Sequence, residues 1–231
     1  MAFGKRIETI AKWVPENTSV ADIGTDHAYL PVLLAQMGKI TFAAAGDIAS
    51  GPCLAAQKTI KSFGLEKIVS VRQGDGLEII TAGEIDIIVI AGMGGTTIIE
   101  ILQKSSEIAK SAARLILQPM NAARELRFWC IRNGWKLINE DLAEEGGIIY
   151  EIIIMERGLD REYPTAVLEA GPRLLEEGHE LLPAHLQRLL ERYSKMLASM
   201  SGSEQAKTSA RYREFLRQKN DLEAIAREIN R

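Results

Sequence analysis

The chain has 231 residues, of which 46% are hydrophobic and 26% charged, a balance that excludes an intrinsically disordered protein. No segment approaches the roughly 18 consecutive apolar residues of a membrane helix, and the first residues lack the apolar core of a secretion signal. We therefore expect a cytoplasmic protein without a membrane partner. The two cysteines, Cys53 and Cys130, form no CxxC pair, and the chain has three histidines. These counts exclude a disulfide framework and argue against a metal site, so we expect no metal and two buried cysteines.

Charge is distributed unevenly along the chain. The net charge is −3, yet the segment from Pro183 onward carries ten Lys and Arg against six Asp and Glu. A phosphate-bearing partner would therefore dock at this end, although a solvated helix face would give the same count.

Short apolar runs alternate with helical patterns through the first part of the chain. The runs are rich in Ile, Val or Ala and close on Gly, Asp or Pro, which is typical of strands buried on both faces of a parallel sheet. The predicted strands are Ser19–Ile23, Ile40–Ala45, Ile68–Arg72, Asp86–Ala91 and Arg114–Gln118. The predicted helices are Ala28–Met37, Pro52–Phe63, Thr96–Ile108 and Ala122–Arg132.

Two further runs predict an antiparallel hairpin at one edge of this sheet. They are Trp135–Asn139 and Ile148–Met155, and the acidic, glycine-containing stretch Glu144–Gly147 separates them. Alternating strands and helices that end in a hairpin indicate an α/β fold with a Rossmann-like sheet.

The pattern of apolar residues changes after this hairpin. Arg157–Pro172 holds two prolines and two glycines and resembles a linker, and apolar residues then recur at helical spacing from Leu182 to Met200 and from Tyr212 to Ile229. With Ser203 as N-cap of the second, 26-residue helix, we predict an antiparallel, coiled-coil-like helix pair. The domains would be 1–160 and 161–231. The apolar stripe of the pair leaves open whether the protein is a monomer or a weak homodimer.

Glycine and aspartate gather directly after the first four predicted strands. In open α/β sheets ligands bind beyond the carboxyl ends of the strands, so these residues should meet at one site. They are Asp22 at the end of the first strand with Gly24, Asp26 and His27 after it, Asp47 and Ile48 after the second, Gly74, Asp75 and Gly76 after the third, and Gly92, Met93, Gly94 and Gly95 after the fourth. Each signal alone is also explained by an ordinary turn or cap. Their convergence indicates a nucleoside site.

The positions of the acids within this set indicate which class of ligand would bind. Asp47 lies 23 residues after Gly24, close to the offset of about 20 residues at which an acid binds a ribose hydroxyl. Asp75 is placed to accept a hydrogen bond from an exocyclic amine such as that of adenine. Where a dinucleotide fingerprint has its second and third glycines, this chain has Asp26 and Tyr29. An acid there repels pyrophosphate and suits a cationic ligand such as S-adenosylmethionine.

Five segments closely resemble the bacterial tRNA (adenine-N(1))-methyltransferases that modify the adenine at tRNA position 22. They are DIGTDHAYLP, AGDIASGPCLAA, VRQGDGLE, IAGMGG and LILQPMN, in this order. The resemblance covers Lys5 to Met155 and extends more loosely into the C-terminal helices. It implies a class I methyltransferase fold, S-adenosylmethionine as the methyl donor and tRNA as the partner.

The resemblance also implies roles for individual residues. The cofactor set comprises Asp22, Gly24, Asp26, His27, Asp47, Ile48, Gly74, Asp75, Gly76, Gly92, Met93 and Gly94. The glycine-rich stretch departs from better-known adenine methyltransferases, which often carry Asn or Asp with Pro-Pro there. For the transfer itself, the candidates are Asp26, His27 and Tyr29, the last by stacking on the target base. The alternatives are a methyltransferase with another substrate and a non-enzymatic RNA-binding module that kept the fold.

Overall fold

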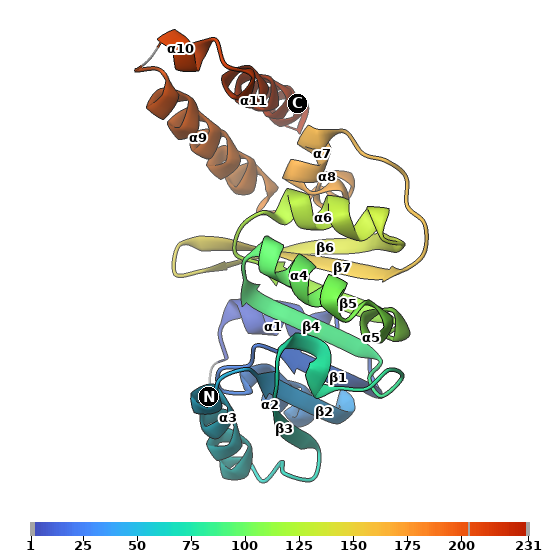
Figure 1. Ribbon diagram of the computed structural model, residues 1–231. Coiled ribbons are helices and arrows are strands. Elements are labelled where there is room, and N and C mark those ends of the chain that lie inside the picture. Colours follow the sequence, from blue (N-terminus) through green and yellow to red (C-terminus); the bar gives the residue numbers. More distant parts are fainter. Residues whose placement is uncertain (1–2, 203, 230–231) are drawn as a thin grey trace. The chain divides into compact units, whose positions relative to one another are not determined.

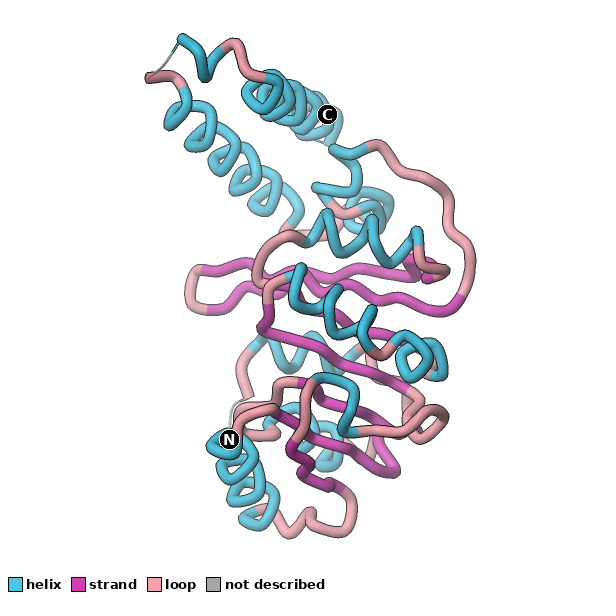
Figure 2. The backbone as a smooth tube through the Cα atoms, viewed as in Figure 1, coloured by secondary structure: helices cyan, strands magenta, loops and turns pink. Residues whose placement is uncertain are grey.

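The computed structural model describes residues 3–202 and 204–229 of the chain. Its internal contacts separate two units, Met1–Asp160 and Arg161–Arg231. The first unit holds the strands together with the helices that alternate with them (Figures 1 and 2). The described elements of the second unit are all helices.

The first unit is built on a seven-stranded sheet in the order β3-β2-β1-β4-β5-β7-β6. The strands are β1 (Thr18–Ile23), β2 (Ile40–Asp47), β3 (Val69–Gln73), β4 (Ile87–Met93), β5 (Arg114–Pro119), β6 (Trp135–Glu145) and β7 (Ile148–Arg157). The first five are parallel, whereas β7 runs antiparallel to both β5 and β6. This confirms the predicted α/β sheet and its edge hairpin. The hairpin strands are longer than predicted and meet at Gly146 and Gly147, both with positive φ.

Two apolar layers cover the two faces of this sheet. Consecutive strand residues point to opposite faces, so Val20 packs in one layer and Ala21 in the other. The layer with Val20 includes buried residues of α1 (Lys5–Lys12), α2 (Tyr29–Gln36) and α3 (Ser50–Ser62). The opposite layer includes residues of α4 (Gly95–Lys104), α5 (Ser106–Ser111), α6 (Ala123–Arg132) and the short 3-10 helix η1 (Gly76–Ile79). Burial on both faces explains the continuous apolar runs of the parallel strands.

Two features of these helices were not predicted. The helix expected over Thr96–Ile108 is divided into α4 and α5, because Ser105 leaves the helical region with φ −117° and ψ 45°. The helix α1 was missed although it buries Thr9, Ile10 and Ala11. It has only eight residues, about two turns, which is short for a periodicity signal.

The second unit contains more helix than predicted. The stretch interpreted as a linker carries the last residue of β7 and then α7 (Thr165–Ala170), and α8 (Pro172–Glu177) begins at its end, so only residues 158–164 lie outside helices and strands before α7. Helices of six residues, as α7 and α8 are, offer too few turns for periodicity to reveal them. The buried Glu169 of α7 accepts a hydrogen bond from the Tyr193 hydroxyl at 3.0 Å.

The predicted helix pair is present as α9 (Leu182–Met200) and α11 (Ala210–Ile229), which fold back on each other within this unit (Figure 1). The second helix is shorter than expected, because α10 (Glu204–Lys207) is separate from it. The Ser209 hydroxyl accepts a hydrogen bond from the backbone N–H of Tyr212 at 3.1 Å, which is an N-cap contact. The cap predicted at Ser203 lies outside the described residues.

Both cysteines are buried, as predicted, and burial raises the pKa of the Cys130 thiol. In residues 3–202 and 204–229, no helix has the length and apolar character needed to span a membrane. Within the same ranges, no cluster of three or more His, Cys, Asp or Glu side chains is placed to hold a metal ion.

Candidate active site

The strand order reverses between β1 and β4, and the residues after these two strands lie at that reversal. Crevices at such a point are the ligand sites of open α/β sheets. Gly24 follows β1 with φ 76°, and its N–H and that of Thr25 both donate to the Gly46 carbonyl, at 2.8 and 2.9 Å. These bonds tie the end of β1 to the end of β2. Two cavities open at this place, and both are lined by Gly24.

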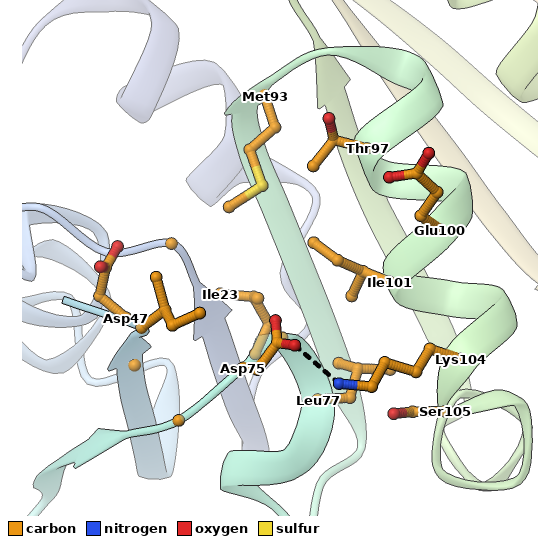
Figure 3. Close-up of a pocket in the computed structure, with 15 residues that line it drawn as sticks. Ile23, Asp47, Asp75, Leu77, Met93, Thr97, Glu100, Ile101, Lys104 and Ser105 are labelled. Atoms are coloured by element: carbon orange, nitrogen blue, oxygen red, sulfur yellow. Dashed lines mark hydrogen bonds and ion pairs between the residues drawn. The ribbon is translucent and has the colours of Figure 1, made fainter.

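The first cavity, here called the α4-side cavity, has a volume of about 340 Å³. Among the predicted site residues, those that line it are Gly24, Asp47, Ile48, Gly74, Asp75, Gly76 and Met93. Its other wall is α4, which contributes Thr97, Glu100, Ile101 and Lys104 (Figure 3). Much of the lining is therefore backbone and apolar side chain, with carboxylates at the rim.

Hydrogen bonds fix two of the acids of the α4-side cavity, Asp47 and Asp75. An oxygen of Asp47 accepts from the backbone N–H of Ala49 at 2.8 Å. Lys104 pairs with Asp75 and also with Glu78, both at 2.7 Å, and these bonds raise the pKa of the lysine (Figure 3). A carboxylate offers about four acceptor positions, so both acids retain capacity for a ligand.

The second cavity, the α1-side cavity, has a volume of about 480 Å³. The predicted site residues that line it are Asp22, Gly24, Asp26, His27, Tyr29 and Gly92. The sequence had given no role to its other polar or aromatic lining residues, which are Arg6, Thr25 and Tyr150. Gly94, predicted for the cofactor, lines neither cavity; a Cβ built on it would lie 3.2 Å from the Asn121 side chain.

Aromatic rings gather at the rim of the α1-side cavity. The rings of His27 and Tyr29 stack with centroids 5.1 Å apart and an interplanar angle of 16°. Ala28, between them, adopts a left-handed conformation with φ 54°, and its N–H donates to the Thr25 hydroxyl. Asp26 lies beside His27, with 3.4 Å between its carboxylate and Nε2, and its side chain is 79% exposed. The three candidate catalytic residues therefore lie together.

Asp22 is the buried acid of the α1-side cavity. Burial raises its pKa from 3.8 to about 6, against the opposing effects of a hydrogen bond with Thr25 and the nearby Arg6 cation. A buried carboxylate whose charge is poorly solvated gains from a cationic ligand. This acid is therefore suited to hold an ammonium group.

Several lining residues had weak or no sequence signals. Thr97, Glu100, Ile101 and Lys104 follow helical spacing, so one face of α4 could have been assigned to the site once the strand before it was placed. Arg6 had no such signal, because a single arginine in a short helix resembles a surface residue. Gln118 was predicted as the last residue of the fifth strand, but its sequence position did not reveal its partners.

Comparison with known proteins agrees with this architecture. Residues 3–153 match a family model described as a methyltransferase domain. The chain is 42% identical over 172 residues to the tRNA (adenine(22)-N(1))-methyltransferase of Bacillus subtilis, covering 74% of this chain and 72% of that protein.

Solved structures extend the similarity over nearly the whole chain. The crystal structure of the Bacillus subtilis m1A22 tRNA methyltransferase has a TM-score of 0.83 and 35% identity, covering 98% of this chain and 97% of that one. A Streptococcus pneumoniae protein crystallised with S-adenosyl-L-methionine has a TM-score of 0.86 and 29% identity, covering 96% of this chain and 99% of that one. The chain therefore belongs to the tRNA (adenine(22)-N(1))-methyltransferase family.

Proposed function

We propose that this chain transfers the methyl group of S-adenosylmethionine to N1 of adenine 22 in tRNA. The observation that carries the proposal is the pair of cavities joined at Gly24, at the strand-order reversal of a methyltransferase fold. The α4-side cavity suits the adenosine part of the cofactor, and the α1-side cavity suits the charged amino-acid end of the cofactor together with the target adenine. The relatives named for this reaction supply the substrate and the position of the target.

The residues of the α4-side cavity fit the adenosine part of the cofactor. Ile48 lines this cavity yet is 65% exposed, so a bound purine would cover an apolar side chain that is otherwise in water. Asp47 is available to the ribose hydroxyls and Asp75 to the exocyclic amine. Gly74 and Gly76 let the backbone approach the base closely. Gly24 and Met93, which both line this cavity, would hold the part of the cofactor that carries the methyl group.

The α1-side cavity would receive the cofactor tail and the target adenine. When bound, S-adenosylmethionine supplies a methyl group on a sulfonium that is ready for displacement by a ring nitrogen. N1 of adenine is largely unprotonated at neutral pH, so the protein need not remove a proton first. Tyr29, stacked on His27, offers a surface for the flipped base, and Asp26 offers a negative charge for the cation that forms on it. The main contribution of the site is in-line positioning of the two reactants.

The second unit would supply contacts to the tRNA phosphates. Flipping a base out of its stack costs a few kcal/mol, which contacts elsewhere must offset. The candidates are Arg188, Arg192, Lys195, Lys207, Arg211, Arg213 and Arg217. Of these, Arg188, Arg192 and Lys195 follow helical spacing on α9 and are exposed, although Arg192 also pairs with Glu169 within the unit. We place this protein in the cytoplasm with its substrate, as a monomer or weak homodimer without a metal.

Nucleoside analysis tests this function directly. We would incubate the protein with S-adenosylmethionine and a tRNA transcript, digest the RNA and identify the methylated nucleoside by mass spectrometry. The expected product is 1-methyladenosine. An N6-methylated adenosine would contradict the assigned ring nitrogen. No methylated nucleoside from a protein that binds the cofactor would favour another substrate, and no cofactor binding at all would favour an RNA-binding module.

A further inference from the structure

Met120 is an apolar residue that lies exposed at the rim of the α1-side cavity. It follows β5, lines that cavity and is 51% exposed. A single exposed apolar residue is common on protein surfaces and by itself indicates no site. The surroundings of Met120 are unusual, however, because groups packed around it hold both its side chain and its backbone.

The buried Gln118 holds the sulfur of Met120. The Gln118 oxygen accepts hydrogen bonds from Nη1 of Arg6 at 2.8 Å and from the backbone N–H of Gly92 at 3.1 Å. Its amide nitrogen donates to the Pro119 carbonyl at 3.0 Å and to the Met120 sulfur at 3.6 Å. Donors at the oxygen and acceptors at the nitrogen allow only this orientation of the amide. The thioether is therefore anchored, although a methionine side chain is otherwise flexible.

The backbone of the loop after β5 is also fixed. The N–H of Met120 donates to the Met93 carbonyl at 2.8 Å, which prolongs the pairing of β4 with β5. Gly95 packs so closely against the loop that a Cβ on it would lie 2.6 Å from the Ala122 carbonyl oxygen. Ala122 has φ 50°, a left-handed conformation that is unfavourable for a residue with a Cβ. Backbone strain of this kind persists where the surrounding structure imposes it, and it clusters at functional sites.

Tyr29 offers a second fixed surface in the same cavity. Its ring stacks on that of His27 and meets the Phe3 ring edge to face, with the latter centroids 6.2 Å apart. Tyr29 follows β1 and Met120 follows β5, and β4 lies between these two strands. Neighbouring strands lie about 4.8 Å apart, so the ends of β1 and β5 are about 10 Å apart. A flat ring that contacts a side chain on each face at about 3.5 Å fits within that separation.

The two surfaces match the flat face of a nucleobase. Sulfur is polarisable and packs favourably against aromatic rings, and bases that have left their stack are commonly held on aromatic side chains. A base between Tyr29 and Met120 would also cover the exposed methionine. Such packing recognises the face of a base and not its edge. It therefore adds affinity for the flipped nucleotide, whereas the choice of adenine requires other groups.

We propose that Met120, positioned by Gln118, packs on one face of the flipped target base while Tyr29 stacks on the other. The inference rests on the proposed function, because it assigns Met120 to the base that is methylated in that reaction. Met120 is the base-binding residue, and Gln118 acts through it as a positioning residue.

The test compares two tRNAs that differ only in the target base. One has adenine at position 22, and in the other that nucleotide is abasic. The Kd of each is measured in the presence of S-adenosylhomocysteine. For Met120→Ala we expect the Kd of the adenine-22 tRNA to rise about three- to ten-fold, within the range for a lost contact of sulfur with an aromatic ring. The Kd of the abasic tRNA should stay within about two-fold, which also reports that the variant is folded.

Three further variants serve as controls and separate the roles. Met37 is also 51% exposed but follows the opposite end of α2 from Tyr29, so Met37→Ala should change neither Kd. Met120→Leu keeps an apolar side chain of similar volume and should bind both tRNAs within about two-fold of wild type. Gln118→Glu keeps the acceptor for Arg6 and removes the donor to the sulfur. The ratio of its two Kd values should shift in the same direction as for Met120→Ala, by a smaller factor.

Distinct results would overturn each part of this inference. An unchanged ratio in Met120→Ala would overturn it, whether neither Kd changes or both rise equally, and an equal rise would assign Met120 to the RNA backbone. An unchanged ratio in Gln118→Glu would overturn the positioning role of Gln118. Wild-type protein that binds both tRNAs but forms no 1-methyladenosine would refute the proposed function itself, a result distinguishable from the others.

Discussion

The two cavities differ in the chemistry of the residues that line them. The α4-side cavity is lined largely by glycines and apolar side chains, and its carboxylates lie at the rim. The α1-side cavity contains a buried acid, a guanidinium held by a buried amide, and a stacked pair of rings. We therefore expect shape and backbone to determine how a ligand fits the first cavity, and charges placed by a hydrogen-bond network to determine how a ligand fits the second. Substitutions that change the available space should therefore affect ligand binding most in the α4-side cavity, and substitutions that change charge should affect it most in the α1-side cavity.

The largest effect should come from Gly24, where the two cavities meet. A Cβ on this residue would lie 2.0 Å from the Met93 methyl group, and its φ of 76° is unfavourable for alanine. We expect Gly24→Ala to reduce affinity for S-adenosylhomocysteine by about ten- to a hundred-fold, because overpacking costs about 1–3 kcal/mol. Isothermal titration calorimetry measures this.

Gly38→Ala is the matched control for this substitution. Gly38 has a similar φ of 68°, but a Cβ there would meet nothing within 4 Å. Both variants should lose about 1 kcal/mol of unfolding free energy from backbone strain. Equal cofactor affinity in the two variants would contradict the steric role of Gly24.

The next effect should come from the charge of Asp22. Only its ionised form attracts an ammonium group, and its pKa in the free protein is raised to about 6 by burial. Cofactor affinity should therefore fall as the pH drops below about 6. Asp22→Asn should weaken binding about ten-fold or more at pH 7.5 and remove most of this pH dependence. A pH profile that is the same in variant and wild type would refute the assignment.

The same substitution should stabilise the protein fold. Because the pKa of Asp22 is higher in the folded than in the unfolded state, its ionisation costs stability as the pH rises from 3.8 to about 6. Above that range Asp22→Asn should unfold with a free energy up to about 3 kcal/mol higher than wild type. The difference should vanish as the pH falls through the same range. Denaturant titrations of both proteins at pH 7.5 and pH 4 measure whether the variant has the higher free energy of unfolding at the higher pH only.

A smaller effect, confined to RNA binding, is expected from the cations of the second unit. Lys195, Arg213 and Arg217 are exposed, and their joint replacement by Gln should weaken tRNA binding about ten-fold at low salt. Affinity for S-adenosylhomocysteine should not change, because both cavities remain intact. Replacement of the exposed Lys58, Lys61 and Lys67 of the first unit removes the same charge and serves as the control. An equal loss of tRNA binding in both triple variants would show that overall charge, and not its location, matters.

The smallest effect should come from Lys104 at the rim of the α4-side cavity. Its ion pairs with Asp75 and Glu78 are about half exposed, and such pairs contribute little. Lys104→Met should change the Kd of 5′-methylthioadenosine by no more than about five-fold. A hundred-fold change would mean that this cavity also depends on charge, and the contrast between the two cavities would be lost.

The sheet was predictable because each strand can be identified from its own short run of residues. Burial on both faces makes β1, β2, β4 and β5 largely apolar, and the glycines and acids that line the cavities stand at or directly after the carboxyl ends of β1, β2, β3 and β4. The elements that escaped prediction, α1, α7 and α8, have six to eight residues each, too few for helical periodicity.

The site residue Arg6 escaped prediction for a different reason. Arg6 gains its place from contacts with Gln118 and Tyr150, which are more than a hundred positions away in the chain. Local spacing carries no information on contacts of that range. The sequence therefore indicates the residues that follow strands, whereas the network that fixes a cation in the α1-side cavity requires the fold.

The most direct test of the proposed function is methyl transfer from labelled S-adenosylmethionine to two tRNA transcripts. One has adenine at position 22 and the other has guanine there, with the rest of the sequence unchanged. We predict that label enters only the first transcript. Equal label in both would contradict the assignment of adenine 22 as the target, and label in neither, from a protein that binds the cofactor, would contradict tRNA as the substrate.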